Sequence, residues 1–187
     1  MDVATHSVYL SLGSNLGDRE ANLLAALAAL PPDVQPMAVS QAYETEPAYY
    51  LDQPPFLNAA CYARTSLPPT ALLTYLKGIE RSLGRRTGVV RFGPRTADID
   101  ILFWDDRVVS TAQLTIPHPR LAERGFVLVP LVEIAPDLVH PLTGLSVADM
   151  LDRLPGPTGV RATRPGFSAK AWAKLAQEGI HGEHGAA

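Results

Sequence analysis

Residues 81–104, RSLGRRTGVVRFGPRTADIDILFW, carry the densest pattern in the chain and decide how the rest is arranged. The first fifteen of these residues hold five arginines and no acid, although the whole chain has a formal net charge of -3. Glycines and a proline interrupt this part, so we expect its arginines on a loop suited to an anion. The last seven residues, DIDILFW, indicate a buried strand that begins with acids.

Asp98 and Asp100 stand two positions apart at the start of this strand. Residues two apart in a strand point to the same side, with Cα atoms about 6 to 7 Å apart. Leu102 and Trp104 continue the acidic side, and the opposite side is apolar: Ala97, Ile99, Ile101 and Phe103. A strand that is apolar on both sides is buried, so we expect the acids at its mouth, beside a cavity.

This combination of acids and arginines favours a phosphate ligand. Mg²⁺ takes one or two carboxylates together with substrate phosphates, and the guanidinium fork of arginine matches phosphate oxygens. The stretch therefore predicts nucleotide phosphoryl chemistry. The alternative is a solvated Arg/Gly loop in front of a strand with a polar end.

The composition is typical of one soluble globular domain: 187 residues, 47% hydrophobic and 19% charged. A single cysteine, Cys61, excludes an internal disulfide and favours a cytoplasmic location. The N-terminal residues lack the pattern of a secretory signal, and no apolar run approaches the length that spans a membrane. Slight net acidity disfavours a nucleic-acid partner. The oligomeric state stays open, with a monomer as the working expectation.

Hydrophobic periodicity predicts strands at 8–12, 36–44, 56–64 and 98–104, with a return strand at 107–110. Helices are expected at 19–30 after an Asp18 cap, at 68–83, at 127–134, and up to residue 154 after a Ser146 cap. The order strand, helix, two strands, helix, strand is that of the split βαβ motif. We therefore predict an α+β fold, a ferredoxin-like βαββαβ sandwich whose mainly antiparallel sheet is packed with helices, plus C-terminal helical additions.

Three polar features are ambiguous on their own. The loop GSNLG at 13–17 suits a ligand and a simple corner equally well. Asn58 lies on a strand side with rings and small residues, where it could read a heterocycle or be satisfied by backbone. His118 sits between two prolines on a rigid loop, where a lone histidine is most simply exposed.

The composition changes after Pro155, where glycine and proline become dense. We predict a domain over residues 1–160 and a C-terminal tail over 161–187. The tail is expected to hold one amphipathic helix at 169–177 and then to be disordered.

The segment RFGPRTADIDILFW at 91–104 resembles the signature of the 6-hydroxymethyl-7,8-dihydropterin pyrophosphokinase family of folate biosynthesis. Three further segments match in the same order: YLSLGSNLGD at 9–18, FLNAA at 56–60 and LTIPHPRLAERGFVLVPLVEIAPDL at 114–138. The resemblance implies transfer of the diphosphoryl group of ATP to the hydroxymethyl oxygen of the reduced pterin, with release of AMP.

On the ATP side, the resemblance implies that Asp98 and Asp100 hold two Mg²⁺ ions. Arg85 and Arg95 match catalytic arginines that contact the phosphates and neutralise charge in the transition state. The residues implied to bind ATP are Arg85, Arg91, Arg95, His118 and Arg124. The loop with Arg85, Arg86 and Arg91 would close over ATP and exclude water.

On the pterin side, the resemblance implies that Phe56 and Phe126 stack on the two faces of the ring. Asn58 and the backbone near Thr45 would read the polar edge, and Asn15 would shape the floor of the pocket. The chain departs from the family pattern in lacking frequent basic residues at Thr87 and Gly88 and a common Trp at Phe92. These departures predict weaker loop closure, which Arg86 or Arg91 would offset, and Phe56 replaces a frequent Tyr.

Two other function classes compete with the enzyme. A ferredoxin-like RNA-binding module would need exposed sheet aromatics and a basic surface, which the acidic chain does not favour. A domain that senses ATP without turnover is compatible with the sequence, but it would not require two acids at metal-binding spacing.

Overall fold

The computed structural model describes residues 5–47, 52–84, 93–156 and 159–163, and its main feature is one six-stranded sheet. The strand order is β5, β1, β4, β3, β8, and β2 also pairs with β4. The strands are β1 (His6–Ser14), β2 (Val34–Val39), β3 (Tyr43–Thr45), β4 (Phe56–Thr65), β5 (Asp98–Trp104) and β8 (Val160–Ala162). All these pairs are antiparallel, so the predicted fold class is confirmed.

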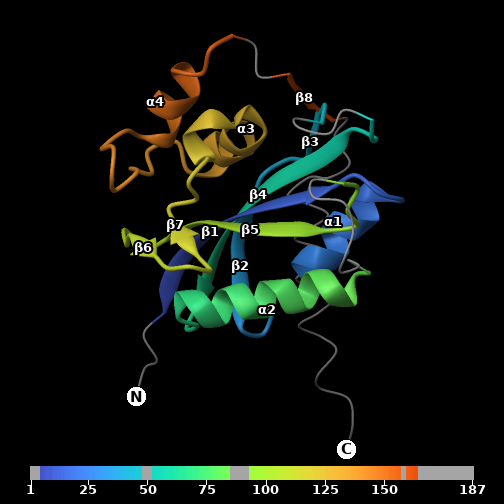
Figure 1. Cartoon of the computed structure of the whole chain (residues 1–187), viewed down its shortest axis with the longest axis horizontal. Helices are drawn as coiled ribbons and strands as arrows, with labels where there is room; N and C mark the ends of the chain where they lie inside the picture. Colours follow the sequence, from blue (N-terminus) through green and yellow to red (C-terminus); the bar gives the residue numbers. More distant parts are fainter. Residues whose placement is uncertain (1–4, 48–51, 85–92, 157–158, 164–187) are drawn as a thin grey trace, which may run out of the picture.

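Helices cover both faces of the sheet (Figure 1). In the described part of the chain, α1 (Arg19–Ala28) and α2 (Pro69–Ser82) lie on one face. On the other face lies α3 (Gly125–Ile134), with α4 (Val147–Asp152) against it. A 3-10 turn, η1 (Leu121–Glu123), precedes α3, and β6 (Val109–Ser110) pairs with β7 (Thr115–Ile116) in a small separate sheet. None of the described helices combines the length and the hydropathy that crossing a bilayer requires.

Two of the helices start at the residues that the sequence predicts. The Asp18 carboxylate accepts a hydrogen bond from the Ala21 amide at 3.0 Å, which satisfies a free N–H in the first turn of α1. At α4, the Ser146 hydroxyl accepts from the Asp149 amide at 3.0 Å, and the Asp149 carboxylate accepts from the Ser146 amide at 3.1 Å. This reciprocal pair is a capping box.

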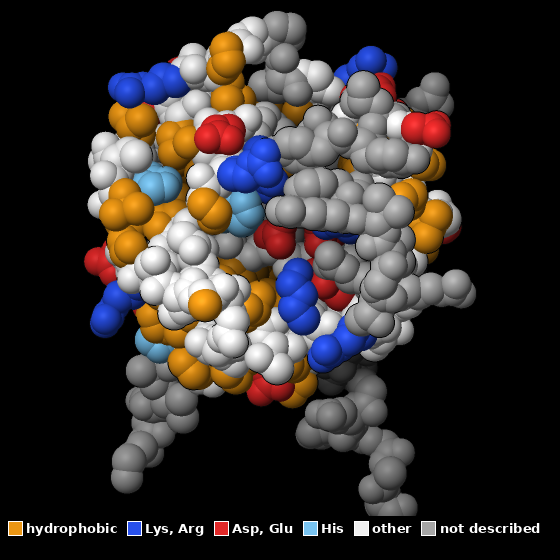
Figure 2. Space-filling view, in the orientation of Figure 1, with side chains coloured by type: hydrophobic (Ala, Val, Ile, Leu, Met, Phe, Trp, Pro, Cys, Tyr) orange, Lys and Arg blue, Asp and Glu red, His pale blue; other side chains and the backbone are white. Residues whose placement is uncertain are grey.

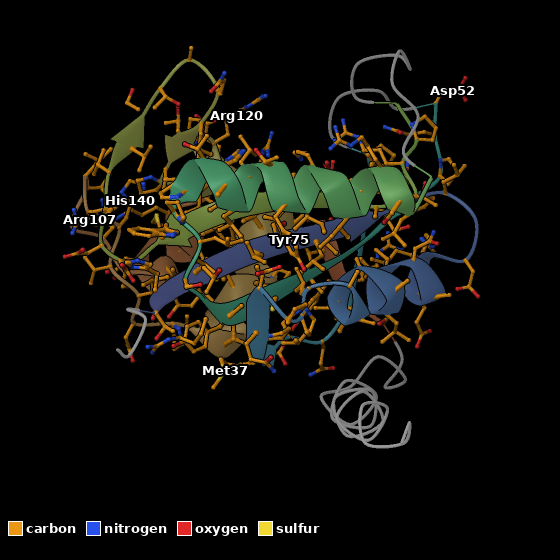
Figure 3. All side chains as sticks on the ribbon, turned by 90° about the horizontal axis from the view of Figure 1, so that it is seen from below. Met37, Asp52, Tyr75, Arg107, Arg120 and His140 are labelled. Atoms are coloured by element: carbon orange, nitrogen blue, oxygen red, sulfur yellow. The ribbon has the colours of Figure 1, made fainter. Side chains whose placement is uncertain are left out.

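A cluster of buried hydrophobic side chains fills the space between the sheet and the first two helices. Leu10 and Leu12 of β1 are 0% exposed and pack in one cluster with Leu27 of α1 and Leu76 of α2. Tyr75 extends from α2 toward α1 (Figure 3), and its hydroxyl donates to the Leu30 carbonyl at 2.9 Å. A second cluster joins the opposite face of the sheet to α3 and α4.

The strict alternation predicted for β5 is wrong at its end. Tyr9 pairs with Phe103 but Leu10 pairs with Ile101, so Leu102 is an extra residue in β5. This β-bulge shifts the side-chain alternation by one residue. Phe103 therefore joins Leu102 in the cluster with α3, and Trp104 joins the core with the first two helices.

The single strand predicted at 36–44 is two strands, β2 and β3, that pair with successive parts of β4. The interruption begins at Ser40, whose amide donates to the Ala60 carbonyl at 2.9 Å. The Ser40 hydroxyl accepts from the Ala60 amide at 2.9 Å. A side-chain oxygen thus takes the place of a backbone carbonyl, and the regular ladder stops there.

Candidate active site

One cavity of about 180 Å³ opens on the α3 side of the sheet, where the ends of β1, β3, β4 and β5 meet the start of α3. Figure 2 shows acidic, basic and histidine side chains gathered at a hollow on this face of the molecule. The cavity is lined by Ser11, Gly13, Thr45, Glu46, Gln53, Phe56, Asn58, Arg95, Asp98, Asp100, Leu102, His118, Arg124, Phe126 and Val127. Nine of the predicted site residues are in this set.

The acid pair lies on this wall as predicted, on one side of β5. The carboxylate of Asp98 forms an ion pair with the Arg95 guanidinium. The carboxylate of Asp100 lies 3.8 Å from the Lys77 ammonium. Each acid thus faces a cation that offsets the repulsion between the two carboxylates.

Two residues of α2 bind the backbone between these acids. Glu80 is 1% exposed, and its carboxylate accepts a hydrogen bond from the Ile99 amide at 2.7 Å. The Lys77 ammonium donates to the Ile99 carbonyl at 3.2 Å and to the Glu80 carboxylate at 2.6 Å. Since β5 is an edge strand, these side chains form hydrogen bonds with backbone groups of Ile99 that have no neighbouring strand to pair with. They thereby hold the backbone that carries the acid pair.

His118 is fixed by the loop that carries it. Its amide donates to the Leu102 carbonyl at 3.0 Å, which ties the loop to β5. Its Nδ1 accepts a hydrogen bond from the Arg120 amide at 3.2 Å. An imidazole that accepts at Nδ1 carries its proton on Nε2 when neutral, so Nε2 remains a donor.

The charge state of His118 follows from its surroundings. Burial lowers the pKa of His118 below its ordinary value. Asp100 opposes this shift by raising the pKa, whereas Arg124 and Arg120 lower it further, and Asp98 again raises it. A pKa below the ordinary value favours the neutral imidazole at neutral pH, in which Nε2 carries the proton.

The opposite part of the cavity is built from rings and an amide. Phe56 and Phe126 both line it, and the Arg124 guanidinium lies 5.4 Å from the centroid of the Phe126 ring. Asn58 is 4% exposed, and its Nδ2 donates to the Thr45 hydroxyl at 2.7 Å. Thr45 therefore fixes the orientation of the Asn58 amide, with Nδ2 toward Thr45 and Oδ1 pointing away from it.

Gly13 makes room for that amide. A Cβ atom added at Gly13 would lie 3.0 Å from the Asn58 Oδ1. That distance is shorter than nine in ten real Cβ contacts, so with a side chain at residue 13 the Asn58 amide would have to shift by a few tenths of an ångström. Gly13 and Asn58 pair across β1 and β4, and the glycine thereby sets the depth of this part of the cavity.

Comparison with known proteins assigns the chain to a family. Residues 9–136 match the family described as 7,8-dihydro-6-hydroxymethylpterin-pyrophosphokinase. The chain belongs to this pyrophosphokinase family. It is 52% identical over 128 residues to the 2-amino-4-hydroxy-6-hydroxymethyldihydropteridine pyrophosphokinase of Bacillus subtilis, which covers 67% of this chain and 76% of that protein.

Other relatives of the pyrophosphokinase family are much longer than this chain. It is 44% identical over 153 residues to the folic acid synthesis protein fol1 of Pneumocystis carinii, covering 81% of this chain and 20% of that one. The chain thus spans about a fifth of the length of the first curated relatives it matches. The Plasmodium falciparum HPPK-DHPS structure superposes with a TM-score of 0.67 at 17% identity, over 82% of this chain and 43% of that chain.

In this member of the pyrophosphokinase family, Asn15 is not among the residues that line the cavity. It is 1% exposed, and its Oδ1 accepts from the Arg95 amide at 2.7 Å. Its Nδ2 donates to the Gln53 side chain at 3.0 Å and to the Pro54 carbonyl at 3.2 Å. Asn15 therefore joins the end of β1 to Arg95 on one side and to Gln53 and Pro54 on the other. That it shapes the floor of the pocket stays a prediction.

Arg85 and Arg91 lie outside the described residues, together with Arg86, Thr87, Gly88 and Phe92. The loop closure that the sequence predicts for them stays a prediction. Sequence reasoning missed Gly13 as a cavity residue, and Lys77 and Glu80 as supports of the acid pair. The only signal for the latter was a charged pair at i, i+3 in α2, which is common on solvated helix faces.

Proposed function

We propose that the chain transfers the β,γ-diphosphoryl group of ATP to 6-hydroxymethyl-7,8-dihydropterin in folate biosynthesis. The hydroxymethyl oxygen bonds to the β-phosphorus and gives up its proton to solvent. The bond from that phosphorus to the AMP oxygen breaks, and AMP leaves with the electron pair. The observation that supports this proposal is that one cavity combines side chains suited to phosphates with side chains suited to a flat heterocycle. Acids, arginines and a neutral histidine line one part, while aromatic rings and an oriented amide line the other.

Arg95, Arg124 and His118 form the proposed ATP phosphate site, with Arg85 and Arg91 contributing from their loop. Arginine pairs with phosphate oxygens through its planar fork, and Nε2 of a neutral His118 adds a fixed donor. Donors fixed before the reaction stabilise charge that develops in the transition state without reorganisation. Arg95 is preoriented for this role because its amide and its side chain are both held, by Asn15 and Asp98.

The acid pair fits Mg²⁺ in its donor set. Asp98 and Asp100 present hard oxygen ligands from one side of a fixed strand, and their side chains are 19% and 38% exposed. In the described ranges, no group of three or more His, Cys, Asp or Glu residues could hold a metal. Phosphate oxygens and water would complete the shell, as Mg²⁺ prefers. We propose that the pair holds two Mg²⁺ ions with ATP, which neutralise phosphate charge and align the reacting oxygens.

Phe56 and Phe126 form the proposed pterin stack, in which a flat heterocycle gains contact with both ring faces. Asn58 Oδ1 is available to accept from the polar edge of the pterin because its Nδ2 is engaged by Thr45. A site built to pair a polar edge rejects ligands that lack it, since its own buried groups would remain unpaired. We further propose that the chain acts in the cytoplasm as a monomer on these two small molecules.

The test is incubation of the purified chain with ATP, MgCl₂ and 6-hydroxymethyl-7,8-dihydropterin, followed by separation of the products. We expect AMP and the pterin diphosphate in equal amounts, and only with Mg²⁺ present. ADP as the nucleotide product would mean transfer of a single phosphoryl group. ATP binding without turnover would mean a sensor, and either result would overturn the proposal.

A further inference from the structure

Strand β8 lies outside the segment that matches the family, yet it is part of the main sheet. It lies beside β3 (Figure 1). The register of the pairing places Val160 opposite Thr45. Thr45 is the residue that orients Asn58 in the cavity. The predicted division of the chain after residue 160 falls inside this strand, so part of the predicted tail contributes to the sheet.

We propose that β8 is a positioning element of the pterin pocket, which holds β3 in register and so fixes the hydrogen bond from Asn58 to Thr45. This inference rests on the proposed function. It assigns to β8 (Val160–Ala162) a role in recognition of the pterin that is separate from the ATP phosphate site.

The first argument is the shortness of β3. It has three residues, and without β8 it would be an edge strand with pairing only to β4. Short edge strands open locally at little cost in free energy. A neighbour on the second side adds a second set of backbone hydrogen bonds and removes that freedom.

The second argument is the distribution of supports along β3. Near its start, the Glu133 carboxylate of α3 accepts from the Gln41 amide and the Tyr43 hydroxyl, each at 2.9 Å. Thr45 lies at the other end, and its two cross-strand neighbours are Phe56 of β4 and Val160 of β8. Directly opposed residues project to the same face of a sheet. Val160 therefore borders Thr45 on the face that contains the cavity.

The third argument is the anchoring of β8 itself. The Thr163 amide and hydroxyl both donate to the Ala42 carbonyl, at 3.2 and 2.7 Å. Hydrogen-bonded pairs recur at every second residue of an antiparallel ladder, so the Arg161 amide belongs to the ladder opposite Glu44. The strand also contacts α3, whose first turn carries Phe126. β8 thus contacts two elements that wall the pterin pocket.

The experiment compares Arg161→Pro with Arg161→Ala in the full chain. Proline removes the amide from the ladder but keeps the extended backbone, whereas alanine removes only the side chain. The dissociation constant of 6-hydroxymethyl-7,8-dihydropterin is measured with Mg²⁺ and an α,β-methylene analogue of ATP, which cannot react. The dissociation constant of the analogue is measured on the same proteins.

We expect Arg161→Pro to raise the pterin dissociation constant by about tenfold, the effect of one hydrogen bond of about 1.4 kcal/mol. Affinity for the ATP analogue should change less than about twofold, because sites that share no contacts affect each other only slightly. Arg161→Ala should match the wild type in both. Thr163→Val, which loses only the hydroxyl bond to Ala42, should shift pterin affinity in the same direction by a smaller factor.

Equal pterin affinity in Arg161→Pro and wild type would overturn the inference and leave the proposed function intact. Parallel loss of pterin and ATP affinity would also overturn it, because that pattern indicates general destabilisation. A wild-type chain that binds no pterin would instead show that the proposed function is wrong.

Discussion

The two faces of the sheet use alternate residues of the same strands, yet one face forms a hydrophobic core and the other lines the candidate site. On β1, Leu10 and Leu12 face α1 and α2 and are 0% exposed, whereas Ser11 and Gly13 line the cavity. Alternation is a property of the extended backbone. The fold therefore obtains a rigid support and a polar site from one segment.

β5 repeats this division at the chemically important end of the sheet. Ile99 and Ile101 are buried in the core, and Asp98 and Asp100 face the cavity. Each acid stands next to a residue that cannot move without disturbing the core. Packing of the apolar face in the core thus holds the polar side chains of the same strand in place. Functional sites are positioned most precisely on such regular elements. Substitutions on the two faces should therefore separate stability from activity.

The largest effect is expected on the polar face. Asp98→Ala and Asp100→Ala should each lower turnover by about a thousandfold, as for loss of a group that stabilises transition-state charge. Pterin binding should remain measurable, and the melting temperature should change little because both side chains are partly exposed. Asp106→Ala, which removes an exposed acid just beyond the same strand, is the control. Rates near those of the wild type would contradict the assigned role.

The apolar face should respond in stability. Leu10→Ala leaves a cavity in the core and should reduce the free energy of unfolding by about 3 kcal/mol, measured by urea denaturation. Turnover per folded molecule should stay near that of the wild type well below the unfolding transition. Met37→Ala, a truncation at a side chain that is 57% exposed, should have little effect. A marked drop in turnover per folded molecule in Leu10→Ala would show that stability and activity cannot be separated between the two faces.

Gly13→Ala tests the boundary between the faces. The added methyl group would displace Asn58, and forcing a side chain off its rotamer costs about 0.5–1.5 kcal/mol. We expect up to about a tenfold rise in KM for the pterin, with KM for ATP unchanged. Gly78→Ala adds the same methyl group in α2, where no atom beyond its chain neighbours and the backbone of its own helix lies within 4 Å of it. An unchanged pterin KM in Gly13→Ala would show that Asn58 can shift freely.

The smallest effect concerns His140, a polar residue that contacts the hydrophobic cluster between the sheet, α3 and α4. It is 9% exposed and lies edge-on to Phe103, with centroids 5.9 Å apart. Burial lowers the pKa of His140 below its ordinary value. The unfolded chain thus binds the proton first, and stability should fall as pH drops below about 6.5. The slope of unfolding free energy against pH should be shallower in His140→Gln; equal slopes would contradict this.

The elements of the fold followed from local patterns. The Asp18 and Ser146 caps and the Pro69 start of α2 are decided by side chains within a few residues of each helix end. The end of β5 was predicted wrongly because its bulge at Leu102 is decided by pairing with β1. The break at Ser40 was missed because its hydroxyl bonds to β4, twenty residues away in the sequence.

The candidate site divides in the same way. Asp98, Asp100 and Arg95 are recognisable because their chemistry and spacing lie within one short segment. Glu80 was missed, since its contact with Ile99 depends on how α2 lies along the edge strand.

By itself, the sequence determined the α+β class, the family and the residues that form the acid pair. These depend on residue type, on the period-two geometry of strands and on spacing, all of which are local. Only the tertiary structure decided that Thr45 orients Asn58, that Gly13 gives it room and that β8 adjoins β3. Those relations join segments far apart in the chain. Long-range packing and hydrogen bonding select such partners, and no local pattern encodes them.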